Sequence, residues 1–152
     1  CCCLTLGCLI NLVLIMVLTH LDSYILIYKQ KPIVKDESKF WQYVKKNTPN
    51  IKWTRIENSA ALGTPDLLGY FNDSFFTIEL KIVKSGNKIR FSPHQISFHI
   101  RHPKNTFILV KDVKNKKFCM YLGSQIYELV ENGLKIKPIT EDFKTYLEKL
   151  TI

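Results

Sequence analysis

Hydrophobic and polar positions change their spacing along the chain, and each change predicts an element of secondary structure. Phe40, Tyr43 and Val44 recur at the spacing of a helix, whereas apolar and polar residues alternate as in a strand between positions 51 and 56. The turn-forming residues 72–74 separate two β-rich runs, which therefore predict a hairpin. The predicted elements are helix 36–46, strands 51–56, 66–71 and 75–83, helix 92–101, strands 106–113 and 117–122, and helices near 124–131 and 140–150.

The predicted helix 92–101 has a clear start and end in the sequence. Ser92 is a typical N-cap residue, Pro93 suits the first turn of a helix, and the helical pattern stops before Pro103. The resulting order is helix, three strands, helix, two strands and two helices, without an internal repeat or a low-complexity linker. This order predicts an α/β fold with a mixed central sheet and helices on both faces.

The first 28 residues form a separate apolar segment. Residues 1–19 carry no charge and are about long enough to cross a bilayer, but they lack the basic start of a secretory signal. One interpretation is a membrane anchor, with Lys29, Lys31 and Lys35 holding the main domain in the cytoplasm, and another is additional core. We favour a third, in which the stretch is upstream sequence and Met16 is the first candidate start, because the sequence does not begin with Met.

Residues 29–152 are expected to form one cytoplasmic domain, which is long enough to bury a core without disulfides. Four of the five cysteines lie within residues 1–8, and only Cys119 lies in the main body. Its apolar neighbours predict a buried thiol. This spacing makes no disulfide framework and favours a reducing compartment, which for a viral protein is the host-cell cytoplasm.

The charge of the chain favours a polyanionic partner. Its 152 residues carry a net charge of +9, with a pI near 9.3. All 22 Lys and Arg residues, but only 12 of the 13 Asp and Glu residues, lie after position 28. Each basic side chain set against a phosphate releases condensed counterions, so nucleic acid is a suitable partner. Solubility is the competing explanation, and charge alone does not decide between the two.

Three ionisable residues of the predicted hairpin form a candidate catalytic group. Glu79 and Lys81 point to one face of their strand, because side chains alternate between faces, and their apolar neighbours point to the other. Asp66 begins the partner strand, and a short turn brings it close to Glu79. Two converging carboxylates repel unless a cation such as Mg²⁺ lies between them, and a lysine can position the water for metal-assisted phosphodiester hydrolysis. The alternative is a cross-strand salt bridge on a solvated sheet face.

The same residues spell a known signature. Pro65-Asp66 followed by Glu79-Leu80-Lys81 resembles the motif of the PD-(D/E)XK nuclease superfamily. Phe91-Ser92-Pro93-His94-Gln95 resembles the Ser-Pro-x-Gln element of its virus-type replication-repair (VRR-NUC) and Holliday-junction-resolvase branches. The resemblance covers roughly residues 36–113. It implies a three-layer α/β/α core like that of restriction endonucleases, with a mixed central sheet.

The resemblance also implies a role for each matching residue. Asp66 and Glu79 bind Mg²⁺ together with the Leu80 backbone carbonyl, and Mn²⁺ substitutes for it. Lys81 assists the attacking water, and Gln95 supports the site from its helix. The implied function is metal-dependent endonucleolytic cleavage of DNA that leaves a 5′-phosphate, in replication, repair or recombination. Many relatives dimerise, so a homodimer is one expected state.

Further residues are expected at the edge of this site. Glu37, in the first predicted helix, stands where the family often places an acid that contacts a second metal or its water. Glu57, just past the first predicted strand, is the rival for this role, and we favour Glu37. His99 and His102 share a helix stripe with Gln95, but a zinc site lacks an evident fourth ligand, so neutral or phosphate-contacting histidines are favoured. The residues expected to contact nucleic acid are Lys84, Lys88, Arg90, His99 and Arg101, and a solvated basic loop is the alternative.

Two other functions stay open at this point. A non-catalytic nucleic-acid-binding module on the same fold is the chief rival, although such a module has no need of converging acids. A membrane-tethered basic protein is the other, and it rests on residues 1–28 alone. DNA is therefore the expected partner, and no small-molecule cofactor is expected beside the metal ion. A membrane is expected only if residues 1–28 belong to the native protein.

Overall fold

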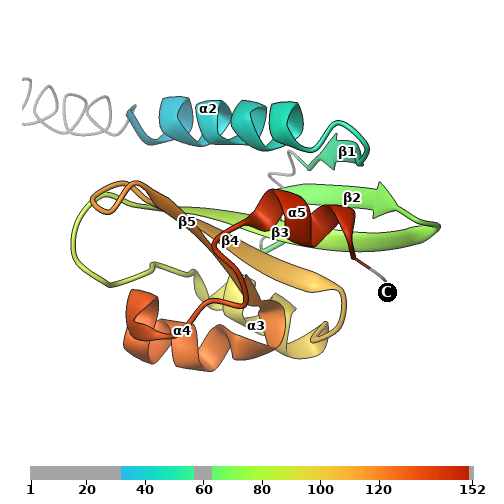
Figure 1. Ribbon diagram of the computed structural model, residues 1–152. Helices are drawn as coiled ribbons and strands as arrows, with labels where there is room; N and C mark the ends of the chain where they lie inside the picture. The colour runs from blue at the N-terminus through green and yellow to red at the C-terminus, as the bar shows by residue number, and fades with distance from the viewer. Residues whose placement is uncertain (1–31, 57–62, 151–152) are drawn as a thin grey trace, which may run out of the picture. The chain divides into compact units, whose positions relative to one another are not determined.

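The computed structural model describes residues 32–56 and 63–150, which Figure 1 draws in colour. By its contacts the chain divides into Cys1–Asp36 and Glu37–Ile152, and the second unit carries the sheet described below. The predicted boundary between residues 28 and 29, and the apolar segment before it, lie outside the described residues. Within the described ranges, no helix combines the length and the apolar character needed to cross a bilayer.

The helices and strands follow the predicted order. They are α2 (Pro32–Asn47), β1 (Lys52–Arg55), β2 (Leu67–Phe71), β3 (Ser74–Val83), α3 (Pro93–Arg101), β4 (Thr106–Asp112), β5 (Lys117–Leu122), α4 (Ile126–Asn132) and α5 (Phe143–Glu148), with 3₁₀ turns at Gly123–Gln125 and Gly133–Lys135. α2 begins before the predicted position 36, because Pro32 suits a first turn, where its missing N–H costs no hydrogen bond. α5 is shorter than predicted, because the Asp142 side chain accepts a hydrogen bond from the Thr145 backbone N–H and caps the helix there.

Five strands form one mixed sheet in the order β1-β2-β3-β4-β5, so the chain is an α/β protein. β3 and β4 are parallel, and α3 lies in the crossover that a parallel pair needs, whereas the other neighbours are antiparallel. The predicted hairpin is confirmed, with Leu67 of β2 opposite Ile78 of β3. Asn72 and Asp73 form its turn with φ of 47° and 58°, a left-handed backbone that these two residue types tolerate.

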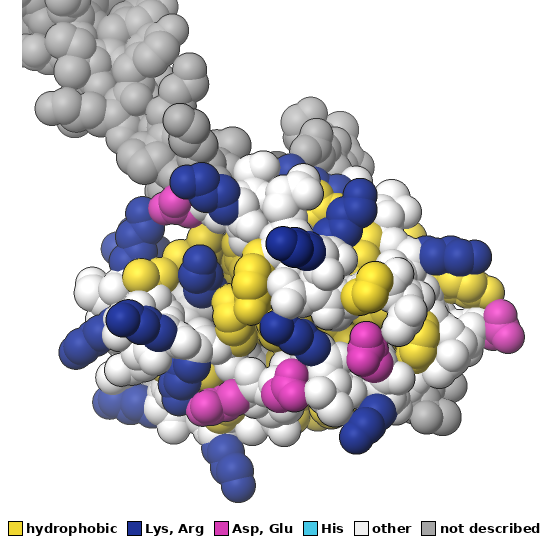
Figure 2. Space-filling model, turned by 45° about the horizontal axis from the view of Figure 1, so that its top comes forward, with side chains coloured by type: hydrophobic (Ala, Val, Ile, Leu, Met, Phe, Trp, Pro, Cys, Tyr) yellow, Lys and Arg dark blue, Asp and Glu magenta, His cyan; other side chains and the backbone are white. Residues whose placement is uncertain are grey.

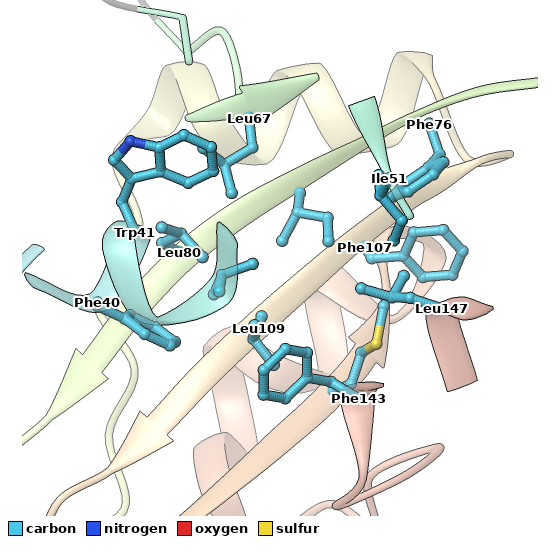
Figure 3. Packing of buried hydrophobic residues seen from close by; sticks show 13 residues of the cluster. Phe40, Trp41, Ile51, Leu67, Phe76, Leu80, Phe107, Leu109, Phe143 and Leu147 are labelled. Atoms are coloured by element: carbon cyan, nitrogen blue, oxygen red, sulfur yellow. The ribbon is translucent and has the colours of Figure 1, made fainter. Parts of the chain in front are cut away.

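One face of the sheet packs against α2 and α5 (Figure 3). Ile78 and Leu80 of β3 point to this face, where Phe40 of α2 and Phe143 of α5 cover it. The buried residues of this cluster are Phe40, Trp41, Val44, Ile51, Leu67, Phe76, Ile78, Leu80, Phe107, Leu109, Met120, Phe143 and Leu147. Full burial of a side chain of this kind contributes about 1.5–3 kcal/mol, so the cluster anchors both helices to the sheet.

The opposite face of the sheet packs against α3 and α4. Figure 1 shows these two helices side by side on this face. The buried residues of this second cluster are Val83, Ile89, Ile108, Val110, Cys119, Tyr121, Ile126 and Leu129. The predicted burial of the Cys119 thiol is confirmed. Because the side chains of β3 alternate, Glu79 and Lys81 point to the α3 face.

Gly69→Ala tests how closely β2 packs on its neighbours. A Cβ at this position would lie 2.5 Å from the Phe76 ring and 2.9 Å from the Trp53 ring, and these rings already pack edge to face. Both rings must move, so we expect the free energy of unfolding in urea titrations to fall by about 1–3 kcal/mol. Thr54→Ala, at an exposed position of β1, should change it by less than about 0.5 kcal/mol. Small, equal effects of the two substitutions would contradict this packing.

Candidate active site

Asp66 lies at the point where β2 begins. Because Leu67 is paired with Ile78, Asp66 stands opposite Glu79 of β3, as the sequence predicts. Its Oδ2 accepts a hydrogen bond of 2.7 Å from the Leu80 backbone N–H. The Asp66 carboxylate thus takes the place of the backbone carbonyl that would accept this hydrogen bond in a regular strand pair. The N–H and C=O of a strand residue face the same neighbouring strand, so the Leu80 carbonyl also faces the Asp66 side.

Glu79, Lys81 and Gln95 form a closed network between β3 and α3. The Nζ of Lys81 lies 3.0 Å from Glu79 Oε1 and donates a hydrogen bond of 3.0 Å to Gln95 Oε1. The Nε2 of Gln95 donates to Glu79 Oε1. Each of the three side chains therefore contacts the other two, and Gln95 reaches the group from its helix as the sequence predicts.

The start of α3 fixes the orientation of the Gln95 amide. Ser92 caps the helix: its Oγ accepts a hydrogen bond of 3.2 Å from the Gln95 backbone N–H, and its own N–H donates to Gln95 Oε1 at 3.0 Å. Gln95 Oε1 thus accepts from both Ser92 and Lys81, which leaves Nε2 as the donor to Glu79. A capping box that starts a helix therefore also holds a glutamine in the site.

The carboxyl group of Glu79 is strongly perturbed. Burial raises its pKa from 4.5 to about 7, and the negative charge of Asp66 raises it as well, while the nearby Lys81 acts in the opposite direction. Glu79 is 1% exposed, and its Oε2 has no hydrogen-bond partner among the described residues. A buried carboxylate oxygen is costly unless it is paired or bound to a cation, so Oε2 is a candidate ligand atom.

Two further acids share this electric field. Burial raises the pKa of Asp66, although hydrogen bonding and nearby cations lower it. Burial also raises the pKa of Glu37 on α2, and the charge of Asp66 raises it further. Glu37 and Asp66 therefore influence each other's charge across the gap between α2 and β2. Glu57, the rival of Glu37 as the helix-side acid, lies outside the described residues.

The donor atoms of this group fit a hard divalent cation. Glu79 Oε2 and the Asp66 carboxylate are oxygen ligands, and the Leu80 carbonyl faces the same side. Among residues 32–56 and 63–150, no three side chains of His, Cys, Asp and Glu enclose an ion by themselves. Mg²⁺ is usually held by one or two carboxylates and keeps several waters, so two acids and a carbonyl suit it.

His99 is buried, which corrects its predicted role as a nucleic-acid contact. It is 1% exposed, and burial lowers its pKa to about 4. A Cβ at Gly123 would lie 2.7 Å from its Nδ1, so a segment far along the chain closes over this ring. His102, by contrast, is exposed and stacks on Phe98.

The other basic residues predicted to contact nucleic acid lie at the surface. These exposed residues are Lys84, Lys88, Arg90 and Arg101. Figure 2 shows Lys and Arg side chains distributed over one whole face of the molecule, with Asp and Glu side chains between them. The exposed positions are compatible with contacts to a polyanion.

Arg55 is a neighbour of the site that the sequence pattern does not single out. It lies on β1 opposite Leu67, the residue that follows Asp66. Its positive charge lowers the pKa of both Asp66 and Glu37. Only the register between β1 and β2 brings Arg55 next to the acids, and the sequence pattern does not specify this register.

No protein-family model matches the sequence, and no curated protein matches it with significance. Asp66, Glu79, Lys81 and Gln95 converge from the start of β2, from β3 and from α3, and Glu37 adds an acid from α2.

The raised pKa of Glu79 makes the stability of the metal-free protein depend on pH. Between pH 4.5 and about 7 the folded protein keeps a proton that the unfolded chain releases, so stability falls as the pH rises through this window. The shift corresponds to at most about 3 kcal/mol. In urea titrations with EDTA, the free energy of unfolding should be lower at about pH 8 than at about pH 5.

Glu79→Gln is the variant that isolates this effect. The amide keeps the size of the side chain and an acceptor for Gln95, but it does not ionise. The free energy of unfolding of this variant should change less between about pH 5 and about pH 8 than that of the wild type. At about pH 8 the variant should be the more stable of the two proteins. A wild-type profile as flat as the profile of the variant would show that Glu79 is not a buried titrating acid.

Proposed function

We propose that this chain is a metal-dependent endonuclease that hydrolyses DNA phosphodiester bonds at a PD-(D/E)XK site. The observation that carries the proposal is a pair of converging acids, Asp66 and Glu79, beside a lysine held by Gln95. A mixed sheet with helices packed on both faces supports a three-layer α/β/α core like that of restriction endonucleases. The net charge of +9 supports a polyanionic substrate.

Each residue has a role that its geometry supports. Asp66, Glu79 and the Leu80 carbonyl would hold Mg²⁺, for which Mn²⁺ would substitute. Such an ion would polarise the scissile phosphate and lower the pKa of the attacking water. Lys81 donates a hydrogen bond to that water or to the negative charge that develops on the phosphate. Gln95 keeps Lys81 and Glu79 in their relative positions through its two amide atoms.

A non-catalytic binding module accounts poorly for the acids. A phosphate-binding surface gains affinity from lysine and arginine, whereas Asp66, Glu79 and Glu37 add negative charge close to Lys81. Burial of Glu79 also lowers stability at neutral and alkaline pH. Strongly perturbed acids gathered beside a lysine are typical of catalytic sites, where the reaction uses them.

Asp66→Asn and Glu79→Gln test the proposed function directly. Each substitution removes one charged ligand and keeps the size of the side chain, so the fold should be retained. With supercoiled plasmid and Mg²⁺ we expect cleavage by the wild type, no cleavage in EDTA, and a loss of at least about 10²-fold in either variant. Loss of a ligand should exceed the loss of about 10- to 100-fold that is typical of outer-shell partners.

Glu141→Gln is the matched control for these variants. Glu141 forms a surface ion pair with Lys117 at 2.7 Å, which repeats the Glu–Lys pairing away from the site. We expect this control to cleave like the wild type. Mg²⁺ should also raise the melting temperature of the wild type and of Glu141→Gln, but not that of Glu79→Gln. Cleavage by Glu79→Gln at the rate of the control, or wild-type cleavage that persists in EDTA, would refute the nuclease assignment.

Lys81→Met tests the proposed part of the lysine in the chemical step. Methionine keeps an unbranched apolar stem but loses the three donors, so the turnover rate should fall by about 10² or more. Affinity for DNA, measured with Ca²⁺ in place of Mg²⁺, should change only a few fold. Lys117→Met is the control and should change neither quantity. Reduced affinity with normal turnover would instead make Lys81 a phosphate clamp.

A further inference from the structure

Three side chains form a row across β1, β2 and β3. Lys52 is paired with Tyr70, and Tyr70 is paired with Phe75, so all three point to the same face of the sheet. The ring centres of Tyr70 and Phe75 are 4.8 Å apart, and Lys52 Nζ lies 5.7 Å from the centre of the Tyr70 ring. We use the name ring row for these three residues, Lys52, Tyr70 and Phe75.

The ring row differs from the aromatic residues of the core in its exposure. Phe75 is 60% exposed, whereas the next residue, Phe76, is buried. A cross-strand aromatic pair stabilises a hairpin, which explains the contact with Tyr70 but not the open face of Phe75. An exposed aromatic face with a cation beside it is the arrangement on which unpaired nucleic-acid bases stack.

The ring row lies on the same face of the sheet as the candidate active site. Phe75 and Glu79 are four residues apart on β3, so they share a face and are separated by about 13 Å. Thr77 lies between them, with Leu68 of β2 as its partner. About four stacked nucleotides, at ~3.4 Å each, cover this distance. The distance from the ring row to the site thus corresponds to a few nucleotides of a single strand.

The chemistry around the ring row favours a single strand of nucleic acid. Lys52 supplies one positive charge within the row. A second lysine, Lys104, precedes Asn105, and the Asn105 carbonyl accepts a hydrogen bond from the Thr77 backbone N–H. Asp73, the acid of the turn, already accepts a hydrogen bond of 2.8 Å from the Tyr70 hydroxyl, which fixes that ring. A duplex offers such a surface only phosphates and groove edges, whereas a single strand also offers the flat faces of its bases.

We propose that the ring row binds unpaired bases next to the scissile phosphate, and that the substrate therefore contains a single-stranded segment. This inference rests on the proposed function for the position of the cleaved bond, but base stacking itself requires no cleavage. Binding and cleavage can thus be measured separately.

Fluorescence anisotropy with a labelled oligothymidylate of about 16 nucleotides, in EDTA, measures binding without cleavage. We expect Phe75→Ala to weaken this binding about 5- to 150-fold, the range typical of one stacked base. Affinity for a blunt duplex should change little. The matched control is Tyr127→Ala, because Tyr127 of α4 is an aromatic residue of nearly equal exposure, 61%, and its loss should leave both affinities unchanged.

Two more variants separate base stacking from the stability of the hairpin. Phe75→Leu keeps an apolar side chain against Tyr70 but has no aromatic face, so it should bind as weakly as Phe75→Ala. Phe75→Trp enlarges the aromatic face and should bind at least as tightly as the wild type. If affinity follows the melting temperatures of the variants and not the presence of a ring at position 75, the hairpin matters only for the fold and the proposal is overturned.

Cleavage tests the substrate class. In Mg²⁺, a duplex with a single-stranded flap should be cleaved faster than a blunt duplex, and Phe75→Ala should remove this preference. The proposal that the ring row binds bases would be overturned if the wild type, Phe75→Ala and Tyr127→Ala bound oligothymidylate equally well. This holds even if the Asp66 and Glu79 variants lose cleavage as expected. Loss of binding in Phe75→Ala without any Mg²⁺-dependent cleavage would support the ring row and refute the nuclease.

Discussion

The candidate site is built around one physical constraint, the burial of a carboxyl group in the middle of the sheet. β3 has a strand on either side, and Glu79 is buried on it. Lys81 and Gln95 engage Oε1, but Oε2 has no hydrogen-bond partner among the described residues, so the charged form is only partly compensated. Replacing a buried ionic group by an apolar residue is often neutral or stabilising. Folding alone therefore gives little reason for an acid here, whereas cation-dependent chemistry does.

The start of α3 is linked to this buried carboxyl group. Gln95 is the third residue of the helix and the amide partner of Glu79 at the same time. If the helix began one residue earlier or later, the Ser92 cap and the contact with Glu79 would both be lost. The crossover from β3 to β4 is thereby tied to the site, because α3 lies between these two parallel strands in the chain. Local capping and candidate chemistry use the same side chain, so neither can change alone.

The sequence predicts well the parts of the site that neighbouring residues determine. Turn residues 72–74, strand alternation and the Ser92–Gln95 spacing are local signals, and they give the hairpin, the start of α3 and the meeting of the acids. The residues that the sequence misplaces or misses depend on distant segments. His99 is enclosed by Gly123, and a nine-residue helix has too few turns for its pattern to show which side is covered. Arg55 approaches the acids only through the β1–β2 register, which no local pattern specifies.

The acids of the site also connect metal binding to protonation. Because burial and the charge of Asp66 raise the pKa of Glu79, a cation competes with a proton for this carboxyl group. Cation affinity should therefore rise with pH. The rise should end at the pH where the carboxyl group of Glu79 is already deprotonated in the metal-free protein. Asp66 and Glu37 raise the pKa of Glu79 by repulsion, and the same charges attract a divalent cation. A substitution that relieves the repulsion stabilises the metal-free protein and weakens its cation site together, because both effects come from the same charges.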